Sequence, residues 1–138
     1  MEGVVAILGL TVFAFFLLFM VITMRRKKTV GKIALVDSEL AVTRKEIVSV
    51  TTGGIPGKTI RSTLGSIVGI SNTAATTDEE FSLAEKEAMR NVLIEAKNLG
   101  ANAVIGLRMS SGTYQRQGSR WLVTKVTYHG TAVHVANC

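Results

Sequence analysis

A lysine in a glycine-rich loop is the residue of this chain best suited to binding nucleotide phosphates. The stretch "TTGGIPGKTI", Thr51 to Ile60, contains the Gly-Lys-Thr that closes a phosphate-binding P-loop. A P-loop also needs a glycine five positions before Gly57, where this chain has Thr52, and it must open a helix. Apolar residues on alternate positions follow Lys58 instead, a pattern that predicts a strand. We therefore interpret this loop as structural.

Two histidines and one cysteine are the residues that could hold a heavy metal. Zinc and copper sites need three or four converging Cys, His or carboxylate ligands. His129 and His134 are the candidate ligands, and the single cysteine is Cys138. Both histidines lie in one expected strand, where their odd separation places them on opposite faces unless a bulge at Gly130 restores a common face. We predict no metal site and no cofactor within one chain.

Residues for catalysis or anion binding are equally sparse. No Ser/His/Asp or Cys/His arrangement is suggested by spacing, so the sequence does not predict an enzyme. Tyr114, Arg116 and Arg120 could bind an anion, but a solvated polar loop is the simpler interpretation. We interpret Trp121 as a packing residue of a strand rather than a platform for a ligand.

The N-terminal segment is strongly apolar. Residues 3–24 contain no charged residue, and 22 helical residues at about 1.5 Å each extend for about 33 Å, which matches a hydrocarbon core of about 30 Å. We predict a single transmembrane helix from Gly3 to Met24. A cleaved secretory signal is the rival interpretation, but it needs basic residues before the apolar core, and here Glu2 precedes it.

The basic residues after this segment predict its orientation and its contacts. Lys and Arg lie only on its C-terminal side, so the positive-inside rule predicts an inner-membrane protein with its N-terminus outside and residues 25–138 in the cytoplasm. We expect Arg25, Arg26, Lys27 and Lys28 to contact lipid head groups, each contributing about 1 kcal/mol. The net charge of +6 is not accompanied by a nucleic-acid reader motif, so we predict no nucleic-acid partner.

The 138 residues divide by composition into three parts. Residues 1–28 form the predicted anchor and its basic flank. The periodicity of residues 29–46 fits neither helix nor strand, so we interpret them as a linker. Residues 47–138 are long enough for one small domain.

The expected domain contains one helix. Thr77 and Glu80 offer a capping box at its start, and Gly100 is placed to end it. Between them the apolar residues recur at three- and four-residue steps, so the helix has one apolar face to lay on a sheet. The charged residues expected to face solvent are Glu85, Lys86, Arg90 and Lys97.

Short β-branched or alternating segments predict four strands around this helix. They begin near residues 46, 59, 101 and 121, and a polar hairpin connection of residues 110–120 joins the last two. The order strand, strand, helix, strand, strand predicts an α+β domain with one helix on an antiparallel sheet.

Three stretches of this domain resemble the YbjQ-like family, a bacterial family of unknown function named for heavy-metal binding. They are "VTTGGIPGKTI" with "LGSIVG", the helix with "LGANAVIGLRM", and "VTYHGTAVHV". The chain departs from the family where "ISNTAATTDEE" leads directly into the helix, without the longer insert usual there. The resemblance implies a dodecin-like fold and a homo-oligomeric ring, with five subunits as the expected number.

Apolar and β-branched residues on both alternations of the last strand also predict a homo-oligomer. One helix can cover only one face of the sheet, so Trp121, Val123 and Thr127 are the predicted interface residues. The function that follows is a membrane-anchored, ring-forming binding or scaffold module. The alternative is a small-ligand or heavy-metal-binding protein whose site lies between subunits.

Overall fold

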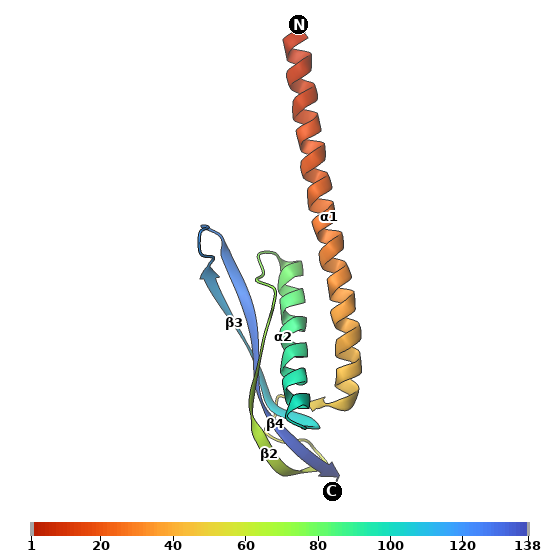
Figure 1. Ribbon diagram of the computed structural model, residues 1–138, viewed down its shortest axis with the longest axis vertical. Helices are drawn as coiled ribbons and strands as arrows, with labels where there is room; N and C mark the ends of the chain where they lie inside the picture. The colour runs from red at the N-terminus through yellow and green to blue at the C-terminus, as the bar shows by residue number, and fades with distance from the viewer. Residues whose placement is uncertain (1, 138) are drawn as a thin grey trace.

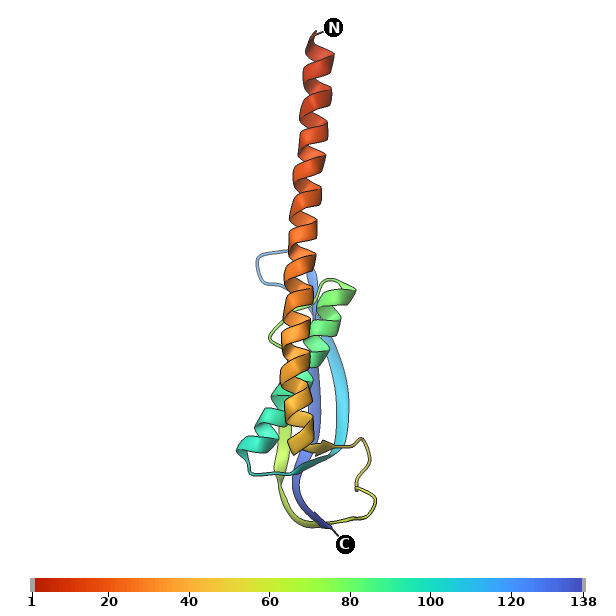
Figure 2. The same cartoon turned by 90° about the vertical axis from the view of Figure 1, so that its right-hand side faces the viewer.

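A computed structural model describes the backbone of residues 2–137 and the side chains of residues 10–136. Its elements are, in order, α1 (Glu2–Glu46), β1 (Val48–Ser49), β2 (Lys58–Ile70), α2 (Asp78–Asn98), β3 (Ala103–Gln115) and β4 (Leu122–Asn137). The domain has three layers, in which α2 lies between the sheet and the C-terminal part of α1 (Figure 1). The N-terminal part of α1 continues beyond the other elements (Figure 2).

The four strands form one mixed sheet in the order β1-β3-β4-β2. β4 is antiparallel to both β2 and β3, whereas β1 is parallel to β3. The prediction of a purely antiparallel sheet with one helix is therefore wrong. The reason is that α1 and α2 run in the same direction, and each leads directly into its strand at the same end of the domain (Figure 1).

The β3–β4 hairpin contains an irregularity opposite Gly130. Its register shifts between Ile105 and Arg108, so two residues of β3 face one of β4, and the extra residue lies in β3. Gly106 in this bulge has a φ of 62°, which favours glycine. β3 also continues into the polar stretch expected to be a loop, as far as Gln115, because its backbone stays paired with β4 up to Leu122. The hydroxyls of Thr113 and Thr124 lie 3.0 Å apart across this hairpin.

Both ends of α2 are capped as the sequence predicts. The hydroxyl of Thr77 accepts from the N–H of Glu80 at 3.2 Å. The carboxylate of Glu80 reaches one residue further back than in a capping box and accepts from the N–H of Thr76 at 2.8 Å. At the other end Gly100 has a φ of 78°, and its N–H and that of the next residue bond back to carbonyls of the last turn. This is the Schellman arrangement.

The main core lies between α2 and the sheet. Small side chains on α2 allow a very close approach to β2, where an added Cβ on Gly69 would lie 2.3 Å from the backbone oxygen of Ala88. The same atom would lie 2.3 Å from the backbone nitrogen of Val92. The buried members of this core are Ile47, Ile67, Ala75, Ala84, Ala88, Val92, Leu93, Ala96, Ala101, Val104, Leu107, Val126, Tyr128 and Ala132.

A second, smaller cluster lies on the face of the sheet turned away from α2, called the outer face below. Ile55 of the β1–β2 loop packs there against Ala103, Val133 and Val135. The loop thus covers one part of the outer face and leaves the part around Val68 and the facing residues of β4 exposed.

Residues 29–46, for which the sequence predicts a linker, form the C-terminal part of α1. Val36 and Leu40 are buried, Ile33 and Thr43 are half-buried, and Ile47, directly after the helix, is buried as well. These positions alternate steps of three and four residues, the spacing of a helix that packs along another helix. The segment is helical because this stripe docks on α2.

Three ion pairs flank the contact between α1 and α2. In each pair the acid belongs to α1 and the base to α2. The pairs are Asp37–Lys86 at 2.5 Å, Glu39–Arg90 at 2.7 Å and Glu46–Lys97 at 2.5 Å. The bases were expected on a solvated face of α2, but that face lies against α1.

The predicted membrane span is not supported. Among the residues that the structure describes, no helix is both long and apolar enough to cross a membrane. The predictions of a transmembrane helix from Gly3 to Met24 and of a single-pass inner-membrane location, with its orientation, are therefore wrong.

Candidate functional site

The two candidate metal ligands lie on opposite faces of β4. His129 is opposite Arg108 and Val68 on the outer face, whereas His134 is opposite Ser62 and points to the other side. The Nε2 atom of His129 lies 3.4 Å from the hydroxyl of Ser110. The bulge near Gly130 belongs to β3, so it does not bring the histidines together. Within residues 10–136, no group of three or more His, Cys, Asp or Glu side chains is arranged to hold a metal.

The three predicted interface residues differ in how much surface they offer. Trp121 is 71% exposed and Thr127 is half-buried. Val123 is only 3% exposed, because it is packed inside its own chain. Trp121 and Thr127 can therefore reach a second subunit, and their role there stays a prediction.

The basic residues Arg25 to Lys28 belong to α1 and lie near the N-terminal end of α2. Arg25 and Lys28 line one cleft between the two helices, and Arg26 lines an adjoining one. Their contact with lipid head groups stays a prediction. The loop before Lys58 leads into β2 rather than into a helix, which agrees with its structural interpretation.

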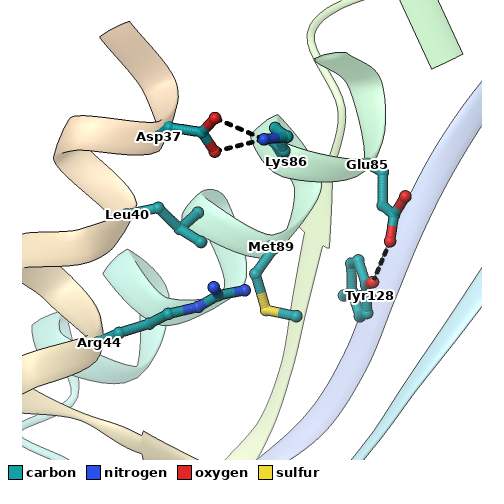
Figure 3. Close-up of a pocket in the computed structure, with 7 residues that line it drawn as sticks. All are labelled: Asp37, Leu40, Arg44, Glu85, Lys86, Met89 and Tyr128. Atoms are coloured by element: carbon teal, nitrogen blue, oxygen red, sulfur yellow. Dashed lines mark hydrogen bonds and ion pairs between the residues drawn. The ribbon is translucent and has the colours of Figure 1, made fainter. Parts of the chain in front are cut away.

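A small cavity lies where α1, α2 and β4 meet, and it is the candidate site of the domain (Figure 3). Its volume is about 180 Å³. All three layers contribute to its wall, so it exists only when α1 is docked. The lining residues are Asp37, Leu40, Arg44, Glu85, Lys86, Met89 and Tyr128.

Two polar pairs fix most of the charged groups in this cavity. The hydroxyl of Tyr128 donates to the Oε1 atom of Glu85 at 3.2 Å, and the ammonium of Lys86 binds the carboxylate of Asp37 (Figure 3). The guanidinium of Arg44 extends along the cavity towards Met89 (Figure 3). The two cations and two carboxylates balance, so the cavity suits a small polar ligand without large net charge.

Sequence reasoning missed this cavity. It assigned Glu85 and Lys86 to a solvated face of α2 and residues 29–46 to a linker. The alternating steps of Val36, Leu40 and Thr43 are the signal that predicts a docked helix, because such a stripe requires a neighbour.

The environment of Tyr128 predicts how it titrates. Burial, followed by the negative charge of Glu85, raises the pKa of the Tyr128 phenol above 10.0. Its contribution to stability is therefore complete below pH 10.0 and is lost as the pH rises through the higher pKa of the folded state. In a Tyr114→Phe background, phenolate absorbance should report a pKa above 10.0. Adding Glu85→Gln should lower the pKa of Tyr128, but not as far as the ordinary value of 10.0, because the phenol stays buried. If Glu85→Gln left this pKa unchanged, the contact between Tyr128 and Glu85 would be contradicted.

Two sequence comparisons identify the family of this chain. The profile of the YbjQ family, described as "Putative heavy-metal-binding", matches residues 73–136. A UPF0145 protein of Acinetobacter baylyi is 35% identical over 79 residues, which cover 57% of this chain and 67% of the relative. The chain belongs to this YbjQ (UPF0145) family. The resemblance seen in the sequence is thus confirmed, without the membrane anchor.

Among solved structures, a DUF74-family protein of unknown function from Pediococcus pentosaceus is similar to this chain. The two are 19% identical with a TM-score of 0.47, and the match covers 65% of this chain and 98% of the other. Within this YbjQ-family chain, the stretch matched by the family profile includes the cavity residues of α2 and β4. The cavity residues of α1 lie before that stretch.

Proposed function

We propose that this protein is a non-catalytic binding module that works as a homo-oligomeric ring. The observation that carries the proposal is that the sheet has two open edges on opposite sides. In the part of the chain that the structure describes, no strand covers the outer edge of β2 between Ser62 and Gly69. β1 covers only the first two residues of β3, so the outer edge of β3 from Arg108 to Gln115 is also uncovered by a strand.

Open edges of this length normally need a partner. A second copy of the chain offers one, because β2 of one subunit can pair with β3 of the next. Such a head-to-tail contact uses different surfaces on the two subunits, and it forms a closed ring when the rotation between subunits closes. The ring implied by the family resemblance agrees with this geometry.

Exposed apolar side chains near the β2 edge and on α1 support the same proposal. Val68 and Ile70 lie exposed on the outer face, beside the edge of β2. On α1, the described apolar residues from Leu10 to Met24 are exposed on all sides. Because every subunit of a ring would extend α1 in the same direction, these segments can meet and bury one another.

The mass of the full-length protein tests the ring. Light scattering should give a multiple of 14.8 kDa, with five subunits as the number implied by the family resemblance. Trp121→Asp should dissociate the assembly while the subunit stays folded, because a charge buried in a contact costs several kcal/mol. A folded monomer of the unmodified chain at micromolar concentration would refute the proposal.

Leu122→Asp is the matched control for the Trp121 variant. Leu122 is the next residue, is 66% exposed, and lies on the opposite side of β4. It should leave the mass unchanged. Equal dissociation by both variants would mean that the side of β4 on which Trp121 lies has no specific part in the contact.

A heavy-metal or small-ligand site between subunits is the second candidate function. The exposed position of His129 on the outer face, beside Ser110 and Arg108, favours it. In a ring, ligands from two chains can complete a set that one chain lacks. A metal assay on protein purified without an affinity tag separates the two proposals, because stoichiometric metal would favour the second.

A further inference from the structure

Three cations gather on one face of α1 beside the start of α2. Arg25, Lys28 and Lys32 are three and four residues apart, which places them along the same side of the helix. They line a cleft of about 250 Å³ between α1 and α2. Its other lining residues are Thr29, Thr73, Glu80 and Leu83.

The positive charge of this cleft is only partly balanced. None of the ion pairs within residues 10–136 includes Lys28 or Lys32. The one carboxylate that lines the cleft belongs to Glu80, which already accepts hydrogen bonds from the backbone and the hydroxyl of Thr76. Like charges three and four residues apart on a helix repel each other, so an anion that binds between them would relieve the repulsion.

The cleft is also extended. A second cleft of about 260 Å³ adjoins it and shares Arg25, Thr29 and Glu80 with it. Ile22 in the second cleft, which is 45% exposed, adds apolar surface. The second cleft adds one cation, Arg26, and one carboxylate, Glu79, so the excess positive charge stays in the first cleft and the second can hold an organic part.

We propose that this cleft binds phosphate groups, as in a phosphorylated small molecule or a pyrophosphate. A phosphate carries more than one negative charge and several acceptor oxygens, which an Arg and two Lys side chains can contact together. The hydroxyls in the cleft contribute little as donors. Thr29 already donates to the carbonyl of Arg25 at 3.2 Å, and Thr73 donates to Glu87 at 3.1 Å. Recognition therefore depends on the cations.

Calorimetric titration of the full-length protein with inorganic pyrophosphate, at constant ionic strength, tests the proposal. Pyrophosphate should bind, and sulfate at the same concentration should bind more weakly. The double variant Lys28→Ala with Lys32→Ala should weaken pyrophosphate binding at least tenfold. A control double variant, Lys27→Ala with Lys45→Ala, removes the same charge from α1 outside this cleft and should change the affinity less than twofold.

Either of two results would overturn the proposal. One is the absence of pyrophosphate binding, and the other is equal weakening by both double variants, which would indicate general attraction to a basic chain. Vesicles with and without phosphatidylglycerol identify the source of the phosphate. Vesicle binding that pyrophosphate displaces and that requires Lys28 and Lys32 would assign a lipid head group, and pyrophosphate binding alone would assign a free phosphate compound.

The cleft lies within one chain, so the proposal does not depend on the ring. Light scattering on the same samples tests the ring separately from phosphate binding. The Lys28 and Lys32 variants should retain the mass of the unmodified protein even when they no longer bind pyrophosphate.

Discussion

Gly69→Ala is expected to destabilise the domain severely, by on the order of 3 kcal/mol. The added methyl would lie 2.3 Å from the backbone oxygen of Ala88 and 2.3 Å from the backbone nitrogen of Val92. Both atoms belong to the middle of α2, which cannot shift without separating from the sheet. Denaturant unfolding followed by circular dichroism would measure the loss.

Gly112→Ala is the matched control for this substitution. Gly112 also lies in a strand, but no atom lies within 4 Å of an added Cβ and its φ is not positive. The free energy of unfolding of the Gly112→Ala variant should stay within about 0.5 kcal/mol of the value for the unmodified chain. If Gly69→Ala changed the free energy of unfolding as little as Gly112→Ala, α2 and β2 would not approach each other as closely as the structure shows.

Leu40→Ala should cost about 2–5 kcal/mol, the range for truncating a buried leucine. Leu40 lies on α1 and is 3% exposed, because it packs in the contact with α2. The loss should appear as weaker protection of the α1 backbone in hydrogen exchange and as a lower midpoint of unfolding. This result would show that residues 29–46 are an integral layer of the domain.

Leu35→Ala is the matched control, because Leu35 lies on the same helix but outside its contact with α2. Leu35 is 60% exposed, so its truncation should change stability by less than about 0.5 kcal/mol. Similar values for the two variants would mean that α1 does not dock on α2 in solution, and the cavity of Figure 3 would then lose one wall.

The helix α2 could be predicted almost completely from the sequence. Its limits depend on local chemistry, since Thr77 caps one end through its hydroxyl and Gly100 adopts the left-handed conformation at the other. The pairing of β3 with β4 was similarly accessible, because a hairpin joins neighbours in the chain. These elements are specified by residues close together in sequence.

The position of α1 could not be derived in the same way. Its stripe of Val36, Leu40 and Thr43 is short, and it can be interpreted only with the α2 surface on which it packs, which lies about 50 residues further along the chain. Composition alone then favoured a membrane span followed by a linker. The parallel direction of β1 depends on the same contact, because it follows from α1 and α2 running side by side.

The candidate cavity depends both on elements that the local sequence predicts and on contacts between residues far apart in the chain. Glu85 and Tyr128 come from well-predicted elements, but their hydrogen bond joins residues 43 positions apart. Periodicity shows which face of an element is apolar, and it does not show which polar side chains meet at its margin. A polar site between layers therefore becomes visible only when the layers are placed.

The three ion pairs between α1 and α2 bear on the order in which parts of the chain fold. They join residues 49 or 51 positions apart, so each must close a long loop. The β3–β4 hairpin closes a much shorter one, and shorter loops lose less conformational entropy. We therefore expect the hairpin to form before α1 docks on α2, and also before β2 pairs with β4, whose partners, such as Ile70 and Thr127, are farther apart still. As the outermost layer, α1 contacts the rest of the domain mainly through α2, so we expect it to detach first, which gives the chain a partially open state in which β2 and β3 stay paired with β4.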